Sequence, residues 1–316
     1  MSGALPGPVG PQGTTITPHG RVITLRHSRY AASVATGGAA LATLSCAGHD
    51  LVLPLDALPP EQAVRAFVGK ILLPWPNRVG GGRYTWDGVE QQLAITEPLL
   101  DNAIHGLVCW ADWSIVESDA ASAVFETTVL AQPGYPHALA ARAAYRLDDS
   151  GLTITVTATN VGDTDAPYGV AVHPYLVSGD ASRPGAADAW TVGLAAPRVI
   201  EADERLLPVG ERDVAAAGLD LRAGRQVGEA TIDHAFAGLP VRWAAVVSAP
   251  DAPFATVLHA DTPWAQVYVG DGVARRAVAI EPMSCPPDAF RSGIGVHRLT
   301  PGASHTLSLR IAAEER

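Results

Sequence analysis

The sequence predicts an all-β fold of many antiparallel strands in stacked sheets, and two observations carry that prediction. Apolar and polar residues alternate with a period of two in several segments, whereas a helical period is nearly absent. Glycine and proline, with 31 and 25 of the 316 residues, are more frequent than average, which suits many short elements joined by turns. Because no internal repeat or change of composition marks a second domain, we expect one domain over residues 16–316 and a flexible tail over residues 1–15.

Individual strands can be assigned along the chain. The clearest is Gly151–Asn160, in which apolar residues alternate with threonine and therefore share one face. Asp87 and Gly88 predict a hairpin turn. The best helix candidate, residues 60–68, is short, and residues 178–189, rich in Gly, Ala, Asp and Pro, are expected to form a long loop. Shorter alternating runs predict further strands at residues 22–25, 124–130, 267–269 and 306–311.

Composition excludes several classes of protein. The chain carries 22 basic and 32 acidic residues, a net charge of −10, without a basic run that would attract a phosphate backbone. Apolar stretches end well before the ~20 residues that span a bilayer, and the first residues lack the pattern of a signal peptide. Three widely separated cysteines argue against a disulfide framework or a cysteine-based zinc site. We expect a cytoplasmic protein that binds neither nucleic acid nor a membrane.

The first polar segment of interest is residues 73–88. Prolines flank Trp75 and stiffen the loop, so that Asn77 and Arg78 offer an amide and a guanidinium suited to hydroxyl groups. An arginine that merely tethers a loop is an equally good explanation. Four tryptophans and Tyr84 lie within residues 75–113, and flat rings suit the apolar faces of a sugar, although core packing is the more common reason for such residues.

Two histidines are candidates for a site. His105 precedes a glycine after a polar turn, where it is free to reach into a cleft, but a lone histidine is more often a structural group. His173 ends a short apolar strand and precedes Pro174, which holds the backbone extended and stops the strand. A side chain at such a rigid strand end is well placed for catalysis.

Two carboxylates complete the set. Asp233 lies among apolar neighbours, and an isolated aspartate of this kind is usually a cap or turn residue. Glu281 follows three apolar residues and precedes Pro282, so we expect a buried strand that stops at the carboxylate. Desolvation at such an edge raises the pKa of a carboxyl group and makes Glu281 a candidate general base near neutral pH. A strand-end glutamate paired with an arginine is the alternative.

Taken in chain order, these segments resemble the aldose 1-epimerase (galactose mutarotase) family over residues 20–312. The matching segments are residues 77–88, 102–106, 173–176, 232–236, 281–290 and 299–303. The resemblance implies a large antiparallel β-sandwich, the galactose mutarotase-like supersandwich, with an open sugar cleft. It also implies an isomerase, an aldose 1-epimerase that interconverts the α and β anomers of a free aldose such as glucose or galactose. The sequence departs from the family pattern at Leu107 and at residues 176–178. These departures bear on the preferred sugar more than on the reaction.

The resemblance also assigns roles to the residues. Glu281 is implied as catalytic base and His173 as catalytic acid, because ring opening takes a proton from the anomeric hydroxyl and delivers one to the ring oxygen. A nearby carboxylate, Asp233 or Glu281, is expected to raise the pKa of His173. No cofactor or metal is required. The implied sugar-hydroxyl ligands are Arg78, His105 and Asp233, with Asn77 assisting Arg78.

Three alternatives stay open at this point. A hexose-6-phosphate 1-epimerase of the same fold needs a basic cluster for the phosphate, and the residues around His105 supply none. A non-catalytic sugar-binding protein on the same scaffold would not need both Glu281 and His173. A glycosidase would use Asp233 and Glu281 as paired carboxylates. In each case the expected partner is a small-molecule sugar, a monosaccharide for the epimerase, and the protein is expected to be a monomer or homodimer.

Overall fold

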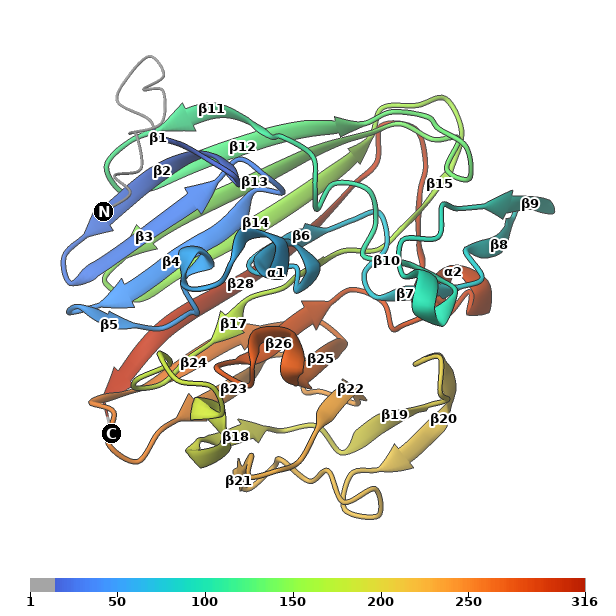
Figure 1. Ribbon diagram of the computed structural model, residues 1–316. Helices are drawn as coiled ribbons and strands as arrows, with labels where there is room; N and C mark the ends of the chain where they lie inside the picture. Colours follow the sequence, from blue (N-terminus) through green and yellow to red (C-terminus); the bar gives the residue numbers. More distant parts are fainter. Residues whose placement is uncertain (1–14, 316) are drawn as a thin grey trace.

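The computed structural model describes residues 15–315, and antiparallel β-sheets dominate it (Figure 1). The predicted tail lies outside the described residues except for Thr15, which already belongs to the first strand. A nine-stranded sheet forms the largest layer. In spatial order its strands are β11 (Ser114–Ser118), β12 (Ser122–Val129), β13 (Leu139–Asp148), β14 (Gly151–Asn160), β28 (Ser304–Glu315), β24 (Phe254–Ala260), β23 (Trp243–Ser248), β18 (Thr191–Leu194) and β21 (Arg225–Gln226).

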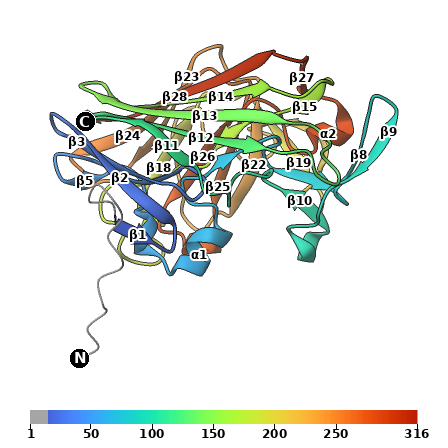
Figure 2. The same cartoon turned by 90° about the horizontal axis from the view of Figure 1, so that it is seen from above.

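An eight-stranded sheet supplies much of the site described below. Its order is β20 (Pro208–Asp213), β19 (Arg198–Ala202), β22 (Ile232–Ala237), β25 (Trp264–Val269), β26 (Val278–Met283), β16 (Ala171–Val172) and β6 (Ile71–Leu72), and β17 (Tyr175–Leu176) also pairs with β26. Figure 2 shows the long strands of the nine-stranded sheet lying over this layer. The strand sequences are apolar on the inner faces, which accounts for the stacking of the sheets into a sandwich.

The remaining elements are smaller. A five-stranded sheet packs against β12, β13 and β14 and contains β1 (Thr15–Thr17), β2 (Gly20–His27), β3 (Tyr30–Ala35), β4 (Ala40–Cys46) and β5 (His49–Asp50). Three strand pairs are β7 (Arg78–Gly80) with β10 (Asn102–Ile104), β8 (Arg83–Trp86) with β9 (Val89–Gln92), and β15 (Ala166–Tyr168) with β27 (His297–Leu299). The helices are α1 (Pro60–Arg65), α2 (Ala289–Ser292) and the 3₁₀ turns η1 (Leu55–Ala57), η2 (Pro98–Leu100), η3 (Ala186–Ala189) and η4 (Asp271–Val273). Within residues 15–315, none of these helices has the length and apolar character needed to cross a membrane.

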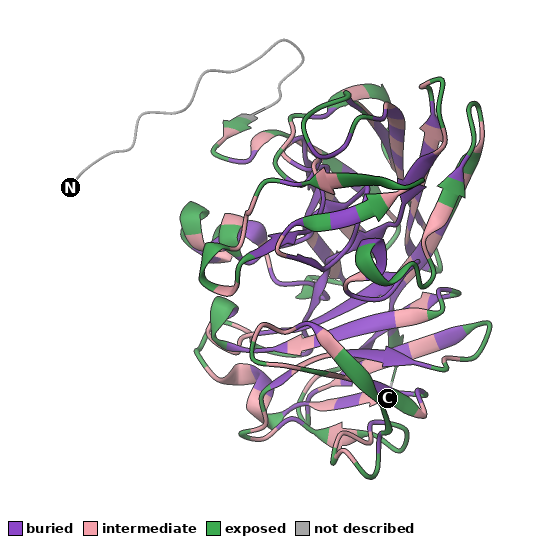
Figure 3. Ribbon diagram, turned by 90° about the vertical axis from the view of Figure 1, so that its right-hand side faces the viewer, coloured by how far each residue is buried: buried purple, intermediate pink, exposed green. Residues whose placement is uncertain are grey.

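Strand β14 shows why period two predicts this fold. Its apolar residues are buried under the sheet, while its threonines lie on the other face and bond to hydroxyls of β28, as between Thr157 and Thr306. The same alternation of buried and exposed positions is visible along many strands in Figure 3. The strands predicted from shorter runs are found within β2, β12, β25 and β28. The predicted fold class is thus confirmed.

Other expectations need adjustment. Helix α1 ends at Arg65, before the predicted residue 68, and the expected loop over residues 178–189 contains the short turn η3. The strand that carries Glu281 does not stop there, because β26 runs through Pro282 to Met283. On one side, β26 pairs with β17 at residues 278–279 and with β16 at Met283. Pro282 lies between these two pairings. Its missing N–H therefore interrupts no backbone hydrogen bonding on that side.

Candidate active site

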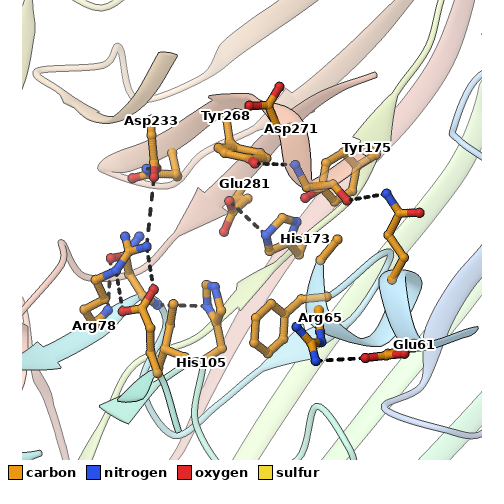
Figure 4. Close-up of a pocket in the computed structure, with 18 of the residues that line it drawn as sticks. Glu61, Arg65, Arg78, His105, His173, Tyr175, Asp233, Tyr268, Asp271 and Glu281 are labelled. Atoms are coloured by element: carbon orange, nitrogen blue, oxygen red, sulfur yellow. Dashed lines mark hydrogen bonds and ion pairs between the residues drawn. The ribbon is translucent and has the colours of Figure 1, made fainter. Parts of the chain in front are cut away.

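A cavity of about 690 Å³ opens over the eight-stranded sheet and brings all six predicted site residues together (Figure 4). They come from five separate parts of the chain. Asn77 and Arg78 stand at the start of β7, His105 follows β10, His173 follows β16, Asp233 is on β22 and Glu281 is on β26. The first and the last of these residues, Asn77 and Glu281, are more than 200 residues apart in the sequence, so only the sheet topology makes them neighbours.

His173 and Glu281 form the deepest polar pair of the cavity. Nε2 of His173 lies 3.3 Å from Oε1 of Glu281, and the two residues are only 5% and 2% exposed. The other oxygen of Glu281, Oε2, is buried and has no hydrogen-bond partner among residues 15–315. A buried carboxylate oxygen without a donor is uncommon in native proteins, and a bound ligand is one way to satisfy it.

Burial determines the protonation of this pair. It raises the pKa of the Glu281 carboxyl well above its usual range, and the nearby Asp233 carboxylate raises it further. Burial lowers the pKa of the His173 imidazole to about 3, so the expectation that a carboxylate raises this pKa is wrong. The loss of hydration outweighs the attraction of Glu281 because both groups lie in the interior. Burial thus acts in the same sense on both groups, because it favours the uncharged carboxyl group of Glu281 and the uncharged imidazole of His173.

The main chain fixes the position of His173. Its backbone N–H donates to the carbonyl oxygen of Lys70 at 2.9 Å, and its own carbonyl accepts the N–H of Gly69 at 3.0 Å. β16 ends at Val172, one residue before the strand end that the sequence predicts at His173, and the carbonyl of Pro174 accepts the N–H of Ile280 on β26. These three bonds hold the histidine beside the strand that carries Glu281.

His105 presents a hydrogen-bond donor to the cavity. The backbone N–H of Asn77 donates to Nδ1 of His105 at 3.2 Å, so Nδ1 must carry a lone pair. Burial lowers the pKa of His105 well below its usual range, with His173 and Arg78 acting in the same direction, so the ring is neutral. Its single proton is then on Nε2, and that N–H suits a sugar hydroxyl oxygen.

Arg78 is held in place by carboxylates. Its Nε and one terminal nitrogen donate to the two oxygens of Glu97 at 2.9 and 3.0 Å, a bidentate arrangement that fixes the plane of the guanidinium. The same terminal nitrogen lies 3.9 Å from Asp233. Asn77 assists through Oδ1, which accepts the backbone N–H of Arg78 at 2.9 Å. Asp233 in turn accepts from the side-chain amide of Gln266 at 2.6 Å.

The site contains one group of side chains with the composition of a metal centre. A ring nitrogen of His105, a ring nitrogen of His173 and an oxygen of Glu281 lie within 4.8 Å of one another. A metal ligand must offer a lone pair, but the bond from Asn77 leaves the proton of His105 on Nε2. This donor set therefore suits a polar organic ligand better than a metal ion.

The aromatic residues of the cavity are not those that the sequence singled out. Trp75, Tyr84 and Trp113 are buried in the core, the ordinary reason for such residues, and none of the residues 75–113 that line the cavity is aromatic apart from His105. The flat side chains at the cavity are instead Phe67, Tyr175 and Tyr268. Sequence reasoning also missed Glu97 and Gln266, which hold Arg78 and Asp233. Tyr175 could have been found from the sequence, because it directly follows His173 and Pro174.

The arrangement combines a proton donor and a proton acceptor with groups that bind hydroxyls. His173 and Glu281 face each other at 3.3 Å, and around them stand the N–H of His105, the guanidinium of Arg78 and the carboxylate of Asp233. Such a set can remove a proton from one oxygen of a polyhydroxylated ligand and deliver a proton to another.

Comparisons with known proteins identify relatives over most of the chain. The family model described as aldose 1-epimerase matches residues 21–312. The chain is 36% identical to an uncharacterised protein of Escherichia coli, YihR, over 94% of each chain, and 28% identical to the galactose mutarotase of Bos taurus over 57% of this chain and 52% of that one. Among solved structures, a galactose 1-epimerase from Lactobacillus acidophilus is similar with a TM-score of 0.75 and 22% identity, covering 93% of this chain and 94% of that one. An aldose epimerase homologue from C. elegans is similar with a TM-score of 0.82 and 20% identity, covering 93% of this chain and 98% of that one.

Proposed function

The chain belongs to the aldose 1-epimerase family, and from that premise we propose that it interconverts the α and β anomers of a free aldose of the glucose or galactose type. The observation that carries the proposal is the buried pair of His173 and Glu281, whose facing atoms lie 3.3 Å apart next to Oε2 of Glu281, an oxygen without a partner among the described residues. Anomer exchange needs one group that takes a proton and one that gives a proton. Over the whole reaction the number of protons on the two groups does not change. The pair meets that requirement without a cofactor.

The proposed reaction begins with the sugar bound across the cavity. In the first step a proton moves from the carboxyl group of Glu281 to Nε2 of His173, which gives a carboxylate and an imidazolium. Polar groups of the incoming sugar favour this charged form. The carboxylate takes the proton of the anomeric hydroxyl while the imidazolium protonates the ring oxygen, so the ring opens to the aldehyde. Rotation about the C1–C2 bond and reclosure on the other face, with both protons returned, gives the other anomer.

The other polar residues bind and orient the sugar. The N–H of His105 and the guanidinium of Arg78 act as donors to hydroxyl oxygens, and Asp233 accepts from a hydroxyl group. Each is held by a neighbour, which reduces the entropy lost when the ligand binds. These hydrogen bonds are proposed to orient the sugar so that its anomeric hydroxyl lies at the buried pair rather than at the cavity mouth.

The charges of the cavity support an uncharged sugar over a hexose 6-phosphate. Arg78 is paired with Glu97, and Arg65, at the rim of the cavity, is paired with Glu61 at 2.8 Å. Further carboxylates, Asp233 and Asp271, line the same cavity. A phosphate would have to compete with these carboxylates for the arginines, whereas hydroxyl groups do not.

The test is the decay of optical rotation of freshly dissolved α-glucose and α-galactose, measured with the wild-type protein and with the Glu281→Gln and His173→Asn variants. We expect faster decay with the wild type and a loss of roughly 10²- to 10⁴-fold in kcat in each variant. Calorimetric titration of Glu281→Gln with the same sugars separates loss of chemistry from loss of binding.

Three kinds of outcome would contradict the proposal. A wild-type rate equal to that of buffer, together with calorimetric binding, would indicate a sugar-binding protein. Turnover restricted to glucose 6-phosphate, or release of sugar from a nitrophenyl glycoside, would indicate the phosphorylated substrate or a glycosidase. Full activity in either variant would show that the roles of Glu281 and His173 are wrong.

A further inference from the structure

Phe67 occupies a backbone position at which glycine is usual. Helix α1 ends in a Schellman arrangement, in which the N–H of Phe67 donates to the carbonyl of Val64 and the N–H of Val68 donates to that of Ala63. This arrangement places the residue after the helix cap in the left-handed region, and Phe67 has φ of +53°. A side chain with a β-carbon is strained there. The fold itself therefore gives no reason for a phenylalanine at this position.

The ring of Phe67 lies at the wall of the cavity and against both of its histidines. Its centroid is 4.5 Å from that of His105, with the planes 63° apart, and 6.3 Å from that of His173, with the planes 23° apart. On another side it contacts the half-exposed ring of Trp110, 5.6 Å away. Contacts in three directions fix the orientation of the ring.

The ring also differs chemically from the two tyrosine rings of the cavity wall. Tyr175 is 2% exposed and offers little surface, and the hydroxyl of Tyr268 accepts the backbone N–H of Gly272. Phe67 is partly buried and carries no polar atom on its side chain. A pyranose has two kinds of surface, hydroxyl groups at its edge and C–H groups on its face. The donors and acceptors described above serve the edge, and an aromatic ring serves the face.

We propose that Phe67 is the surface on which the apolar face of the sugar ring packs, and that this contact directs the anomeric carbon toward Glu281 and His173. The proposal rests on the proposed function of the same cavity. In this view the strained backbone at Phe67 is retained for binding, because it turns a flat ring toward the two histidines.

The test compares variants that separate the ring from the backbone. Phe67→Gly removes the ring and relieves the left-handed strain, Phe67→Leu removes the flat ring and keeps the strain, and Phe67→Tyr keeps both. Ala47→Gly is the matched control, because Ala47 has a similar φ of +49°, is exposed and lies in the turn between β4 and β5, outside the cavity lining. Circular dichroism checks that each variant is folded.

We expect KM for α-glucose or α-galactose to rise about tenfold in Phe67→Gly and Phe67→Leu, which corresponds to the loss of one aromatic contact. The Ala47→Gly variant is expected to stay within twofold of the wild type, and Phe67→Tyr, which keeps the ring, should raise KM less than Phe67→Gly or Phe67→Leu. Folded Phe67→Gly with an unchanged KM would overturn the inference, and so would a change in kcat alone, since that would indicate a role in positioning the histidines.

The same variants distinguish this inference from the proposed function. If the wild type does not catalyse anomer exchange, the proposed function fails, and calorimetric Kd values for the same sugars replace KM in the comparison. A tenfold weaker Kd in Phe67→Gly would then still support the contact. Absence of both turnover and sugar binding in the wild type would overturn both.

Discussion

The backbone N–H of Asn77 donates to Nδ1 of His105, and this bond decides which proton the imidazole presents to the cavity. Asn77 has φ of +55°, a conformation that asparagine tolerates better than most residues with a β-carbon. The same turn lets its Oδ1 accept the N–H of Arg78. One residue thus sets the tautomer of His105 and accepts the backbone N–H of Arg78, the two residues proposed to donate to sugar hydroxyls.

The two contributions of Asn77 can be separated by substitution. Asn77→Gly keeps the backbone N–H and the left-handed conformation but removes the acceptor for Arg78, whereas Asn77→Ala also strains the backbone. We expect Asn77→Ala to be less stable than Asn77→Gly by about 1 kcal/mol in urea unfolding. Both should raise KM, because Arg78 loses the same hydrogen bond. Equal stability of the two variants would show that the backbone at this position relaxes.

Glu97 is expected to act on binding through Arg78. Glu97→Gln removes one charge from a bidentate pair whose side chains are 10% and 21% exposed, so we expect a loss of about 2 kcal/mol in stability and a rise in KM of about tenfold. Glu117→Gln is the control, since Glu117 pairs with Arg142 on an exposed surface. That variant should leave KM unchanged. A KM equal to the wild type in Glu97→Gln would mean that Arg78 keeps its position without the carboxylate.

Gly106 holds the loop that carries His105 against residue 73. It has φ of +75°, and a β-carbon at this position would lie 2.1 Å from the carbonyl oxygen of Leu73. We therefore expect Gly106→Ala to lose more than about 3 kcal/mol of stability. The backbone at Leu73 has to move away from the new β-carbon, and alanine is also strained at this positive φ. Gly48 has a similar φ of +82° but open space around it, and Gly48→Ala should lose only about 1 kcal/mol. Similar losses in the two variants would contradict the close approach at Leu73.

The pKa shifts of the buried pair predict opposite effects on the pH dependence of stability. Glu281 has a raised pKa, so its contribution is complete below pH 4.5 and is lost as pH rises toward the raised value. Relative to the wild type, Glu281→Gln should therefore gain about 1.4 kcal/mol per pH unit above pH 4.5. His173 has a lowered pKa, so its contribution is present above pH 6.5 and is lost as pH falls toward 3.

Urea unfolding of the wild type, Glu281→Gln and His173→Asn at pH 5, 6, 7 and 8 checks both signs. The difference between the wild type and Glu281→Gln should decrease as pH rises, and the difference between the wild type and His173→Asn should increase from pH 5 to 6.5 and then level off. Parallel curves for all three proteins would show that the pair is hydrated enough to titrate normally.

The sequence predicted the strands whose two faces differ and the site residues that belong to recognisable segments. Gly151–Asn160 is found as β14 with the predicted bounds, because one face meets the core and the other bears threonine. Period two cannot show which strands become neighbours. The pairing of Gln266 with Glu281 across β25 and β26 is therefore visible only in the structure.

The residues missed by the sequence act through tertiary contacts. Glu97 lies in a loop with ordinary loop composition, and its role appears only once Arg78 is seen between it and Asp233. Phe67 looked like part of the predicted helix, and its left-handed backbone follows from the early end of α1. The error in the direction of the His173 pKa has a similar origin, since the extent of burial depends on the packing of whole sheets.

The position of β28 determines whether the nine-stranded sheet is continuous. This strand lies in the middle of the sheet, paired with β14 on one side and β24 on the other. Without it the strands on its two sides would have no common partner, and the sheet would end at two edges of unpaired backbone groups. Such edges pair with other chains, so we expect damage to β28 to cause aggregation and not only a local loss of packing.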